Sequence, residues 1–194
     1  MAVKKCNSIQ QSVGWCPGAP QLAGIRKRVY YIDKSQIVKF AQLERDENGR
    51  ASSAKLKGDF VLAADAKFKY IDILANKSGH TSDPQGETPS QTQLNKLVLV
   101  HPGTEEEASA LSVYLNNSDN LFIFQDKKGN YRVVGNEKYD TVTTVSQDSG
   151  QSPTDQVSTT INVEVTDEVI TPFYMGKLDT EDGEIDCSTG AIAA

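Results

Sequence analysis

The chain has 194 residues and a formal net charge of −6, a length that suits one moderate domain, or one domain with long arms. An acidic chain is a poor candidate for gripping nucleic-acid phosphates over a wide surface. Only two histidines and three widely separated cysteines are present, so the composition favours a shaped surface over an enzyme. We expect no catalytic residue, no cofactor and no bound metal.

Residues 1–24 contain two prolines and isolated apolar side chains without a sustained period, which predicts an extended N-terminal arm with Trp15 as an aromatic anchor. No apolar stretch follows Lys4 and Lys5, and no run of the chain approaches membrane-spanning length. We therefore expect a soluble protein that is made in the cytoplasm and has no membrane partner. The hydrophobic share of 38% favours loops or termini that become ordered against a partner.

Residues 26–32 are β-branched and aromatic, which predicts a first strand, and Asp33 can cap a short turn of helix through Phe40. The pair Asn48-Gly49 is the strongest hairpin signal of the chain and lies in a charged segment that we expect to be an exposed hairpin or loop. The next predicted strands are 59–64 and 67–75.

Residues 76–93 are polar and contain no large apolar side chain, which predicts a long loop that is functional or is ordered by a partner. A strand is expected to follow at 94–101. Thr104 and Glu107 have the spacing of a capping box, so a helix is predicted over 104–116. Its apolar stripe, which should lie on the sheet, consists of Ala108, Leu111 and Leu115 and is flanked by Tyr114.

The second half of the chain has the pattern of strands separated by turns and by one more polar loop at 146–156. Residues 121–125 are apolar on both faces and should be central, whereas 157–165 alternates apolar and polar side chains as a half-buried antiparallel strand does. Pro172 in the last apolar run fits an edge strand or a docking tail. The other predicted strands are 131–134, 139–145 and 169–174.

Short motifs for catalysis or metal binding are lacking in the sequence. The stretch Trp15-Cys16-Pro17-Gly18 has no second cysteine at the spacing that thiol exchange needs. No G-x-S-x-G elbow presents a serine, and no glycine-rich phosphate loop joins a strand to a helix. A pair of catalytic carboxylates stays open, because its geometry is not visible in a sequence. No short ligand pair for zinc occurs among Cys6, Cys16, Cys187, His80 and His101.

The predicted elements sum to a mainly β fold with one packed helix, an α+β class, arranged as an antiparallel β-sandwich or small barrel with extended N- and C-terminal arms. We expect an N-terminal arm over 1–24, a single domain over 25–178 and an acidic C-terminal tail over 179–194. The tail and the basic cluster 26–28 have opposite charge, so they can pair between identical subunits.

The order of these elements resembles the tail-tube and ring proteins of tailed bacteriophages. The likeness rests on a strand pair interrupted by the long polar loop, a helix, the strand-turn-strand LFIFQDKKGNYRVVG and a late strand STTINVEV that leads to TPFY. The N-terminal stretch, GWCPGAP followed by IRKRVYYI, is similar to the start of structural proteins in phages and prophages of gut bacteria. The resemblance covers most of the chain through its organisation and not through an invariant motif.

The resemblance implies a virion structural protein of the phage tail, synthesised in the cytoplasm of the bacterial host. Its sheets would join edge to edge with copies of itself in a closed ring, expected to be hexameric, and the rings would stack into a tube for DNA ejection. Other tail or neck proteins are expected partners. An acidic lumen would let DNA slide without specific binding, although Lys67 and Lys69 lie on a candidate lumen strand.

A set of residues is predicted to contribute to the subunit interface. The loop 76–93 is expected to reach a neighbouring subunit or ring, and the arm to pack through its tryptophan on an adjacent copy. An aromatic pair near the C-terminus is expected to anchor the tail. The candidates are Trp15, Ile25, Tyr30, His80, Asp83, Glu87, Phe173 and Tyr174.

Two alternative functions remain open at the level of the sequence. A neck or connector ring, or an adaptor protein of the virion, would use the same fold without polymerising into a tube. A monomeric β-sandwich that binds a carbohydrate or a peptide would place aromatic side chains on its loop tips. The loops 76–93 and 146–156 contain no aromatic residue, which argues against this alternative.

Overall fold

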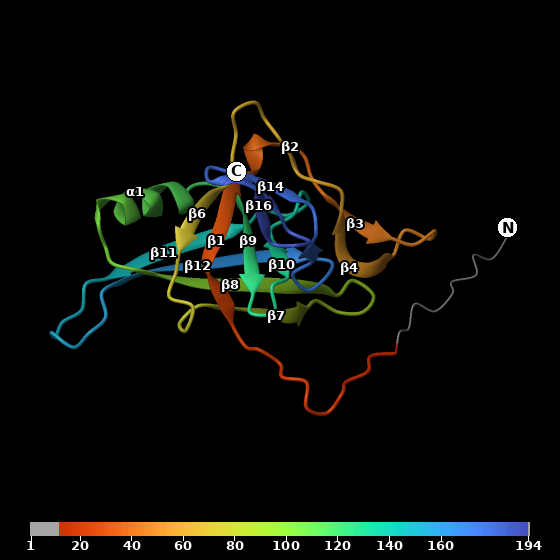
Figure 1. Ribbon diagram of the computed structural model, residues 1–194, viewed down its shortest axis with the longest axis horizontal. Helices are drawn as coiled ribbons and strands as arrows, with labels where there is room; N and C mark the ends of the chain where they lie inside the picture. The colour runs from red at the N-terminus through yellow and green to blue at the C-terminus, as the bar shows by residue number, and fades with distance from the viewer. Residues whose placement is uncertain (1–11, 194) are drawn as a thin grey trace.

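The computed structural model describes residues 12–193 and shows a mainly β protein with one α-helix, α1 (Glu106–Leu115). Two main sheets enclose an apolar core, and α1 lies at one end of the smaller sheet (Figure 1). The predicted class, a β-sandwich-like α+β fold with antiparallel sheets, is confirmed.

The larger sheet has seven strands. In spatial order they are β3 (Gln42–Arg45), β4 (Ala51–Lys57), β13 (Phe173–Tyr174), β10 (Tyr131–Val134), β9 (Asn120–Asp126), β1 (Ile25–Asp33) and β6 (Lys69–Asp72). Neighbouring strands are antiparallel, apart from β13 and β4, which run parallel. The turn between β3 and β4 contains Asn48 and a left-handed Gly49, so the hairpin predicted there is confirmed.

The smaller sheet has four antiparallel strands, in the order β11 (Val142–Asp148), β12 (Ser158–Asp167), β8 (Thr92–Pro102) and β7 (Gly79–Gln85). The last residues form a three-stranded sheet of β14 (Lys177–Thr180), β15 (Gly183–Asp186) and β16 (Ala191–Ala193). A two-stranded unit pairs β2 (Ile37–Lys39) with β5 (Val61–Leu62).

A single 3-10 turn, η1 (Lys34–Gln36), joins β1 to β2. Asp33 caps this turn as predicted, because its carboxylate accepts a hydrogen bond from the Ser35 N–H at 2.8 Å. The helical conformation does not continue to Phe40, because the chain enters β2 at Ile37.

The central strands of the larger sheet separate two apolar cores. On β1, Val29 and Tyr31 face the core between the main sheets, whereas Tyr30 and Ile32 face a second core beneath the C-terminal sheet. Each face of these strands is therefore covered by different elements, which explains why residues 121–125 are apolar on both sides and confirms their central place. On β9, Phe122 and Phe124 face the first core, and Leu121 and Ile123 face the second.

Residues 76–93 are not the long loop that their polar composition predicts. Most of them form β7, the turn after it and the start of β8, and β7 pairs with β8 from Gly79 opposite Val98 to Gln85 opposite Thr92. Main-chain hydrogen bonds join β7 to β8. An edge strand with one solvent-exposed face therefore needs few apolar side chains. The edge position also tolerates Pro84.

The prediction of an acidic tail over 179–194 is also wrong, because the described part, 179–193, belongs to the folded domain. Asp179 and Glu184 are exposed, whereas Leu178, Ile185 and Cys187 are buried in the second core. The acids and apolar residues alternate with the period of a half-buried strand, and the high acid content obscures that period. The domain therefore does not end at 178.

The helix begins at Glu106, later than the capping box predicts. Glu105 occupies the N-cap position, and within the described chain no side chain makes a capping hydrogen bond there, so Thr104 lies outside the helix. Two glutamates still lie in the first turn, where acidic side chains complement the helix dipole. Ala108 and Leu115 are buried, so the prediction that the apolar stripe packs on the sheet is confirmed.

Candidate functional site

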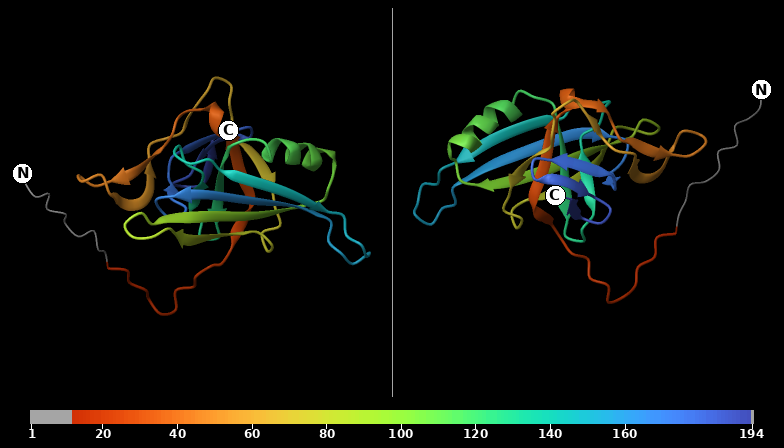
Figure 2. Two further views of the ribbon diagram at one scale, coloured as in Figure 1. Left: turned by 180° about the vertical axis from the view of Figure 1, so that it is seen from behind. Right: turned by 45° about the horizontal axis from the view of Figure 1, so that its top comes forward.

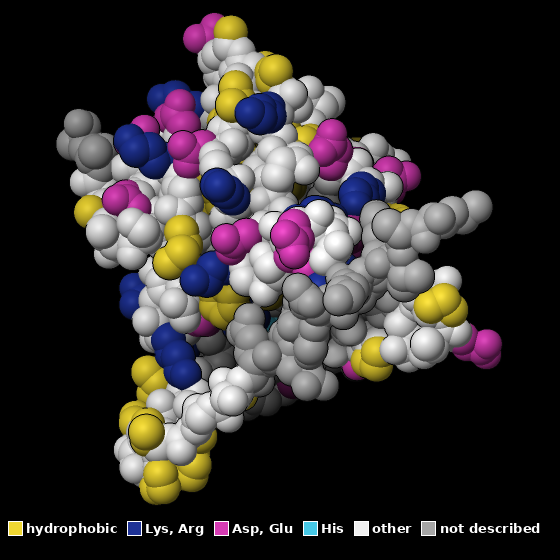
Figure 3. Space-filling view, turned by 90° about the vertical axis from the view of Figure 1, so that its right-hand side faces the viewer, with side chains coloured by type: hydrophobic (Ala, Val, Ile, Leu, Met, Phe, Trp, Pro, Cys, Tyr) yellow, Lys and Arg dark blue, Asp and Glu magenta, His cyan; other side chains and the backbone are white. Residues whose placement is uncertain are grey.

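The N-terminal arm is described over residues 12–24, where it forms neither helix nor strand. Val13, Trp15 and Leu22 on this arm are 96%, 64% and 56% exposed. The arm is attached at its base, where the Lys127 N–H donates to the Gly24 carbonyl at 3.2 Å. The arm is the lowest part of the chain in Figure 1, and hydrophobic side chains gather on the corresponding lowest projection of Figure 3. Cys6 and the remainder of 1–11 lie outside the described residues.

Four strands lie at the borders of the two main sheets. β11 and β7 border the smaller sheet, and β3 and β6 border the larger one, each with a single neighbour among residues 12–193. An edge strand presents main-chain N–H and C=O groups to any strand of another chain. β7 and β11 are each seven residues long, which is sufficient for pairing with a second copy.

The smaller sheet turns one face to the core and the other to solvent. The strand register places hydroxyl and amide side chains of β11 and β12 on the outer face together with a few charges. The Lys96 ammonium lies 3.1 Å from the Asp83 carboxylate, and Glu164 is the cross-strand partner of Lys96. Asp148 adds a third carboxylate on β11, so acids outnumber bases on this face.

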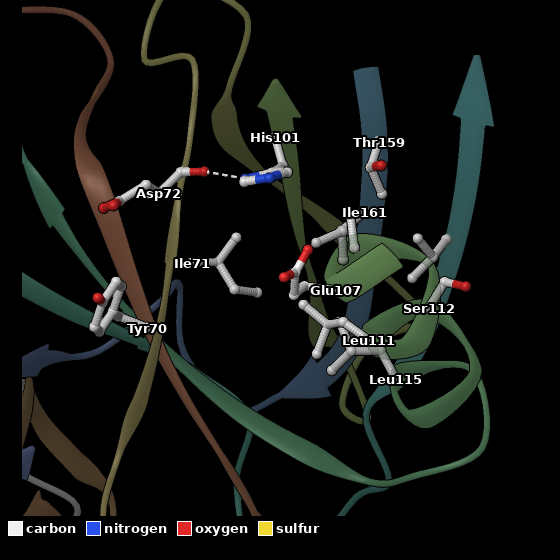
Figure 4. A pocket seen from close by; sticks show the side chains of 12 residues that line it. Tyr70, Ile71, Asp72, His101, Glu107, Leu111, Ser112, Leu115, Thr159 and Ile161 are labelled. Carbon is white, nitrogen blue, oxygen red and sulfur yellow. Dashed lines mark hydrogen bonds between the residues drawn. The ribbon is translucent and has the colours of Figure 1, made fainter. Parts of the chain in front are cut away.

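An apolar pocket of about 210 Å³, called the α1 pocket below, lies between α1 and strands of both main sheets (Figure 4). Ile71, Leu115 and Ile161 form its floor, and all three are buried. Leu111 on α1 and Val145 on β11 line its sides. The interior of the pocket therefore favours an apolar occupant.

The mouth of the α1 pocket is polar and contains Tyr70, Asp72, His101 and Glu107. His101 Nδ1 lies 2.7 Å from the main-chain oxygen of Asp72, and because a carbonyl only accepts, Nδ1 carries the proton. In the tautomer with the proton on Nδ1, Nε2 is an acceptor. Figure 4 shows the Glu107 carboxylate directed into the same opening, so an imidazole nitrogen and a carboxylate lie above the apolar floor.

Arg28 supports one side of this mouth. Its guanidinium lies 3.8 Å from the ring centroid of Tyr70, and it forms ion pairs with Asp72 at 2.8 Å and with Asp182 at 2.9 Å. The hydrogen bond to Asp72 raises the pKa of Arg28 above its ordinary value, so the guanidinium stays charged. These contacts connect β1, β6 and the turn between β14 and β15.

Three predicted interface residues lie in the protein's own core. Ile25, Tyr30 and Tyr174 are buried, because the two cores cover both faces of β1 and the second core covers β13. The Tyr174 hydroxyl donates to the Lys177 carbonyl at 2.7 Å and accepts from the Phe60 N–H at 3.4 Å, and burial raises the pKa of Tyr174. Their surface is already used within one subunit, which corrects their prediction as interface side chains.

The exposed candidates lie on separate parts of the molecule. Trp15 is on the arm, Asp83 is on the outer face of β7, and Glu87 is in the turn that follows β7. Asp83 and Glu87 therefore lie on one border of the smaller sheet, whereas Trp15 lies on the arm.

His80 and Phe173 are half-buried. The His80 ring lies over Phe124, with 4.8 Å between the ring centroids, and burial together with the positive charge of Arg132 lowers the pKa of His80. The same Arg132 guanidinium lies 4.1 Å from the centroid of Phe173. Both aromatic side chains therefore have packing partners inside the subunit.

The α1 pocket is the feature that sequence reasoning misses. The spacing of Glu107, Leu111 and Leu115 places a carboxylate on the same helical stripe as two apolar residues, and that is the available signal. Tyr70 and His101 come from strands of different sheets, and only the folded topology brings them to one opening.

Comparisons with protein-family models, curated proteins and solved structures find no match to this chain. Within residues 12–193, no three His, Cys, Asp or Glu side chains are grouped so that they could hold a metal ion. Over the same described span, no helix combines the length and the apolar character needed to cross a membrane.

Proposed function

We propose that the chain is a virion structural protein, a tail-tube subunit that assembles into stacked rings for the passage of phage DNA. The observation that carries the proposal is the arm, which holds Val13, Trp15 and Leu22 largely in solvent. Burial of a large apolar side chain contributes about 1.5–3 kcal/mol, so these residues favour association with another copy. A subunit designed to work alone has little reason to display them.

The borders of the smaller sheet support edge-to-edge assembly. β7 and β11 lie at opposite edges of this sheet, so pairing β7 of one copy with β11 of the next would continue the sheet from subunit to subunit. Such a contact uses two different surfaces, and it closes into a ring when the rotation between copies permits.

The outer face of the smaller sheet fits a conduit for DNA. On its four strands Lys96 is paired with Asp83, and the other charges are the carboxylates of Glu164 and Asp148. Lys77, which precedes β7, borders the same face beside Asp148, so carboxylates still outnumber lysines there. An acidic wall repels phosphates and does not retain them. Lys69 lies on β6 of the larger sheet and Lys67 directly precedes that strand, so neither belongs to this face.

The test of assembly uses the full chain over a range of concentrations. Sedimentation velocity should show a species heavier than the monomer, and electron micrographs should show rings that stack into tubes. Rings of one size that never stack would favour the neck or connector alternative. A monomer at every concentration up to the solubility limit would exclude both.

The lining assignment has its own test. Purified wild-type protein should not retain duplex DNA in a mobility-shift assay at moderate salt. The double variant Asp83→Lys, Glu164→Lys reverses the charge of the outer face and should retain DNA in a salt-dependent manner. The matched control, Glu47→Lys with Glu137→Lys, makes the same charge change at exposed residues elsewhere. Equal retention by both double variants would contradict the assignment of this face.

A monomeric ligand-binding sandwich is the second candidate, and the α1 pocket favours it, because an apolar cavity with a polar mouth is typical of small-molecule sites. Native mass spectrometry of the purified full chain separates the two functions. A monomer that carries a bound small molecule would favour the ligand-binding sandwich.

A further inference from the structure

We propose that the α1 pocket receives the side chain of Trp15 from the arm of a second copy of this chain. The inference rests on the proposed function and names the surface through which one subunit holds the next. Each subunit has both parts of this contact: an apolar cavity beside α1, and an exposed aromatic side chain on a projecting arm.

The size and chemistry of the α1 pocket match an indole. An apolar cavity of about 150 Å³ accommodates benzene, so the 210 Å³ here leaves room for the larger bicyclic ring. Indole combines a broad apolar face with a single N–H donor and no acceptor. The mouth supplies the complementary acceptors, Nε2 of His101 and the carboxylate of Glu107, above the floor formed by Ile71 and Ile161 (Figure 4).

The chain contains one tryptophan, and that residue is Trp15. It is 64% exposed, and Val13 beside it is more exposed still. Tryptophan at an interface contributes more than other residue types when it enters a dry pocket, because a large rigid surface is buried at little cost in side-chain entropy.

The placement of the arm points to a second copy. In all the ribbon views the arm leaves the domain on the side opposite α1 (Figures 1 and 2). The hydrogen bond between Lys127 and Gly24 fixes its base, and the segment from Trp15 to Gly24 spans at most about 30 Å. Each subunit therefore offers its tryptophan on one side and its pocket on the other, which is a head-to-tail contact.

The direct test uses the full-length variant Trp15→Ala, which contains no tryptophan and retains the α1 pocket. A synthetic peptide of residues 12–24 is titrated with this protein, and the emission of its tryptophan is recorded. We expect a saturable blue shift as the indole leaves water. An unlabelled competitor peptide with Trp15→Phe, which keeps a ring but lacks the N–H donor, should displace the tryptophan peptide only at higher concentration.

Two helix variants in the Trp15→Ala background locate the binding site. Ala108→Phe adds a ring inside the pocket and should abolish the blue shift, whereas Ala110→Phe makes the same change at an exposed position of α1 and should leave it intact. Circular dichroism of both variants shows whether they fold. If Ala108→Phe does not fold, chemical-shift changes of labelled Trp15→Ala protein on peptide addition locate the site instead.

Assembly provides the second readout. Trp15→Ala should raise the concentration needed for half-maximal assembly about 30-fold or more, as expected for an interfacial hot spot. If the wild type assembles and Trp15→Ala assembles equally well, the inference is wrong and the proposed function stands. If the wild type never assembles, the proposed function itself fails.

Mixing two variants tests whether the α1 pocket receives the arm of a neighbouring copy. Trp15→Ala has a free pocket, and Ala108→Phe has a free tryptophan, so the two proteins together should form a mixed pair that neither forms alone. Absence of the pair, while the peptide still binds, would show that the arm does not reach the pocket of a neighbouring copy and would overturn the proposal. A small molecule that copurifies in the pocket and blocks the peptide would also overturn the proposal.

Discussion

Single residues explain where the sequence predictions of an interface go wrong. Tyr174 ends an apolar run with a proline, a pattern that fits an exposed docking tail as well as a buried strand. Its hydroxyl connects the Phe60 N–H to the Lys177 carbonyl, so one side chain joins three segments of the second core. Lys177 is three residues from Tyr174, but Phe60 is 114 residues away, so the role of this hydroxyl is visible only in the fold.

Tyr174→Phe removes this hydroxyl and leaves a buried amide and a carbonyl without their partner. We expect the free energy of unfolding to fall by about 1–3 kcal/mol, measured by urea denaturation. Tyr139→Phe is the control, because Tyr139 is exposed and its substitution should change stability by less than about 0.5 kcal/mol. Equal effects of the two substitutions would contradict the bridging role.

His80 makes stability depend on pH. Burial and the nearby Arg132 lower its pKa in the folded protein below the value of 6.5 that the unfolded chain has. As the pH falls below 6.5, the unfolded state takes up the proton first, so the free energy of unfolding decreases until the pH has passed the folded pKa. His80→Phe keeps a ring on Phe124 and should reduce this loss, as measured by urea denaturation at pH 7.5, 6.0 and 5.0. An unchanged difference between these pH values would rule out His80 as the source.

At the scale of elements, prediction succeeds where side-chain period and burial agree. The strand over 157–165 and the turn at Asn48-Gly49 were predictable, because alternation and a left-handed glycine leave a local signature. β7 was not predictable, since a polar edge strand is held by its main chain. The C-terminal sheet was not predictable for a different reason. Acidic residues dominate its composition, and only a few apolar residues pack it against the core.

The C-terminal sheet should therefore contribute to the stability of the whole domain. Ile185→Ala removes a buried side chain from the second core and should lower the free energy of unfolding by about 2–5 kcal/mol. Ile192→Ala is the matched control, because Ile192 pairs with Ile185 across the strands and yet is 61% exposed. Thermal denaturation of both variants measures the difference. A small effect of Ile185→Ala would restore the interpretation of this segment as a tail.

At the scale of the whole molecule, the two cores share one wall. β1 and β9 contribute alternate side chains to each core, so loss of packing on one face releases the strands that support the other. The sequence indicated a mainly β fold with one helix, but not this division, because apolar residues on both faces of a strand do not say what covers each face.

We expect the domain to unfold in a single transition. The far-ultraviolet circular dichroism, which reports the strands, and the near-ultraviolet signal of the buried tyrosines should change at the same urea concentration. Tyr31 belongs to the first core and Tyr30 and Tyr174 to the second, so the near-ultraviolet signal samples both. Two separate midpoints would show that the cores unfold independently.

The arm leaves the domain on the side opposite α1, so if Trp15 of each copy enters the α1 pocket of the next, a row of copies has a direction. An open row would have an exposed Trp15 at one end and an unfilled α1 pocket at the other, so each end would lack one contact. Closure of such a row into a ring would remove both ends at once, so a closed ring would be favoured over an open row. Because the two ends of an open row differ, a different protein could bind to one end and not to the other.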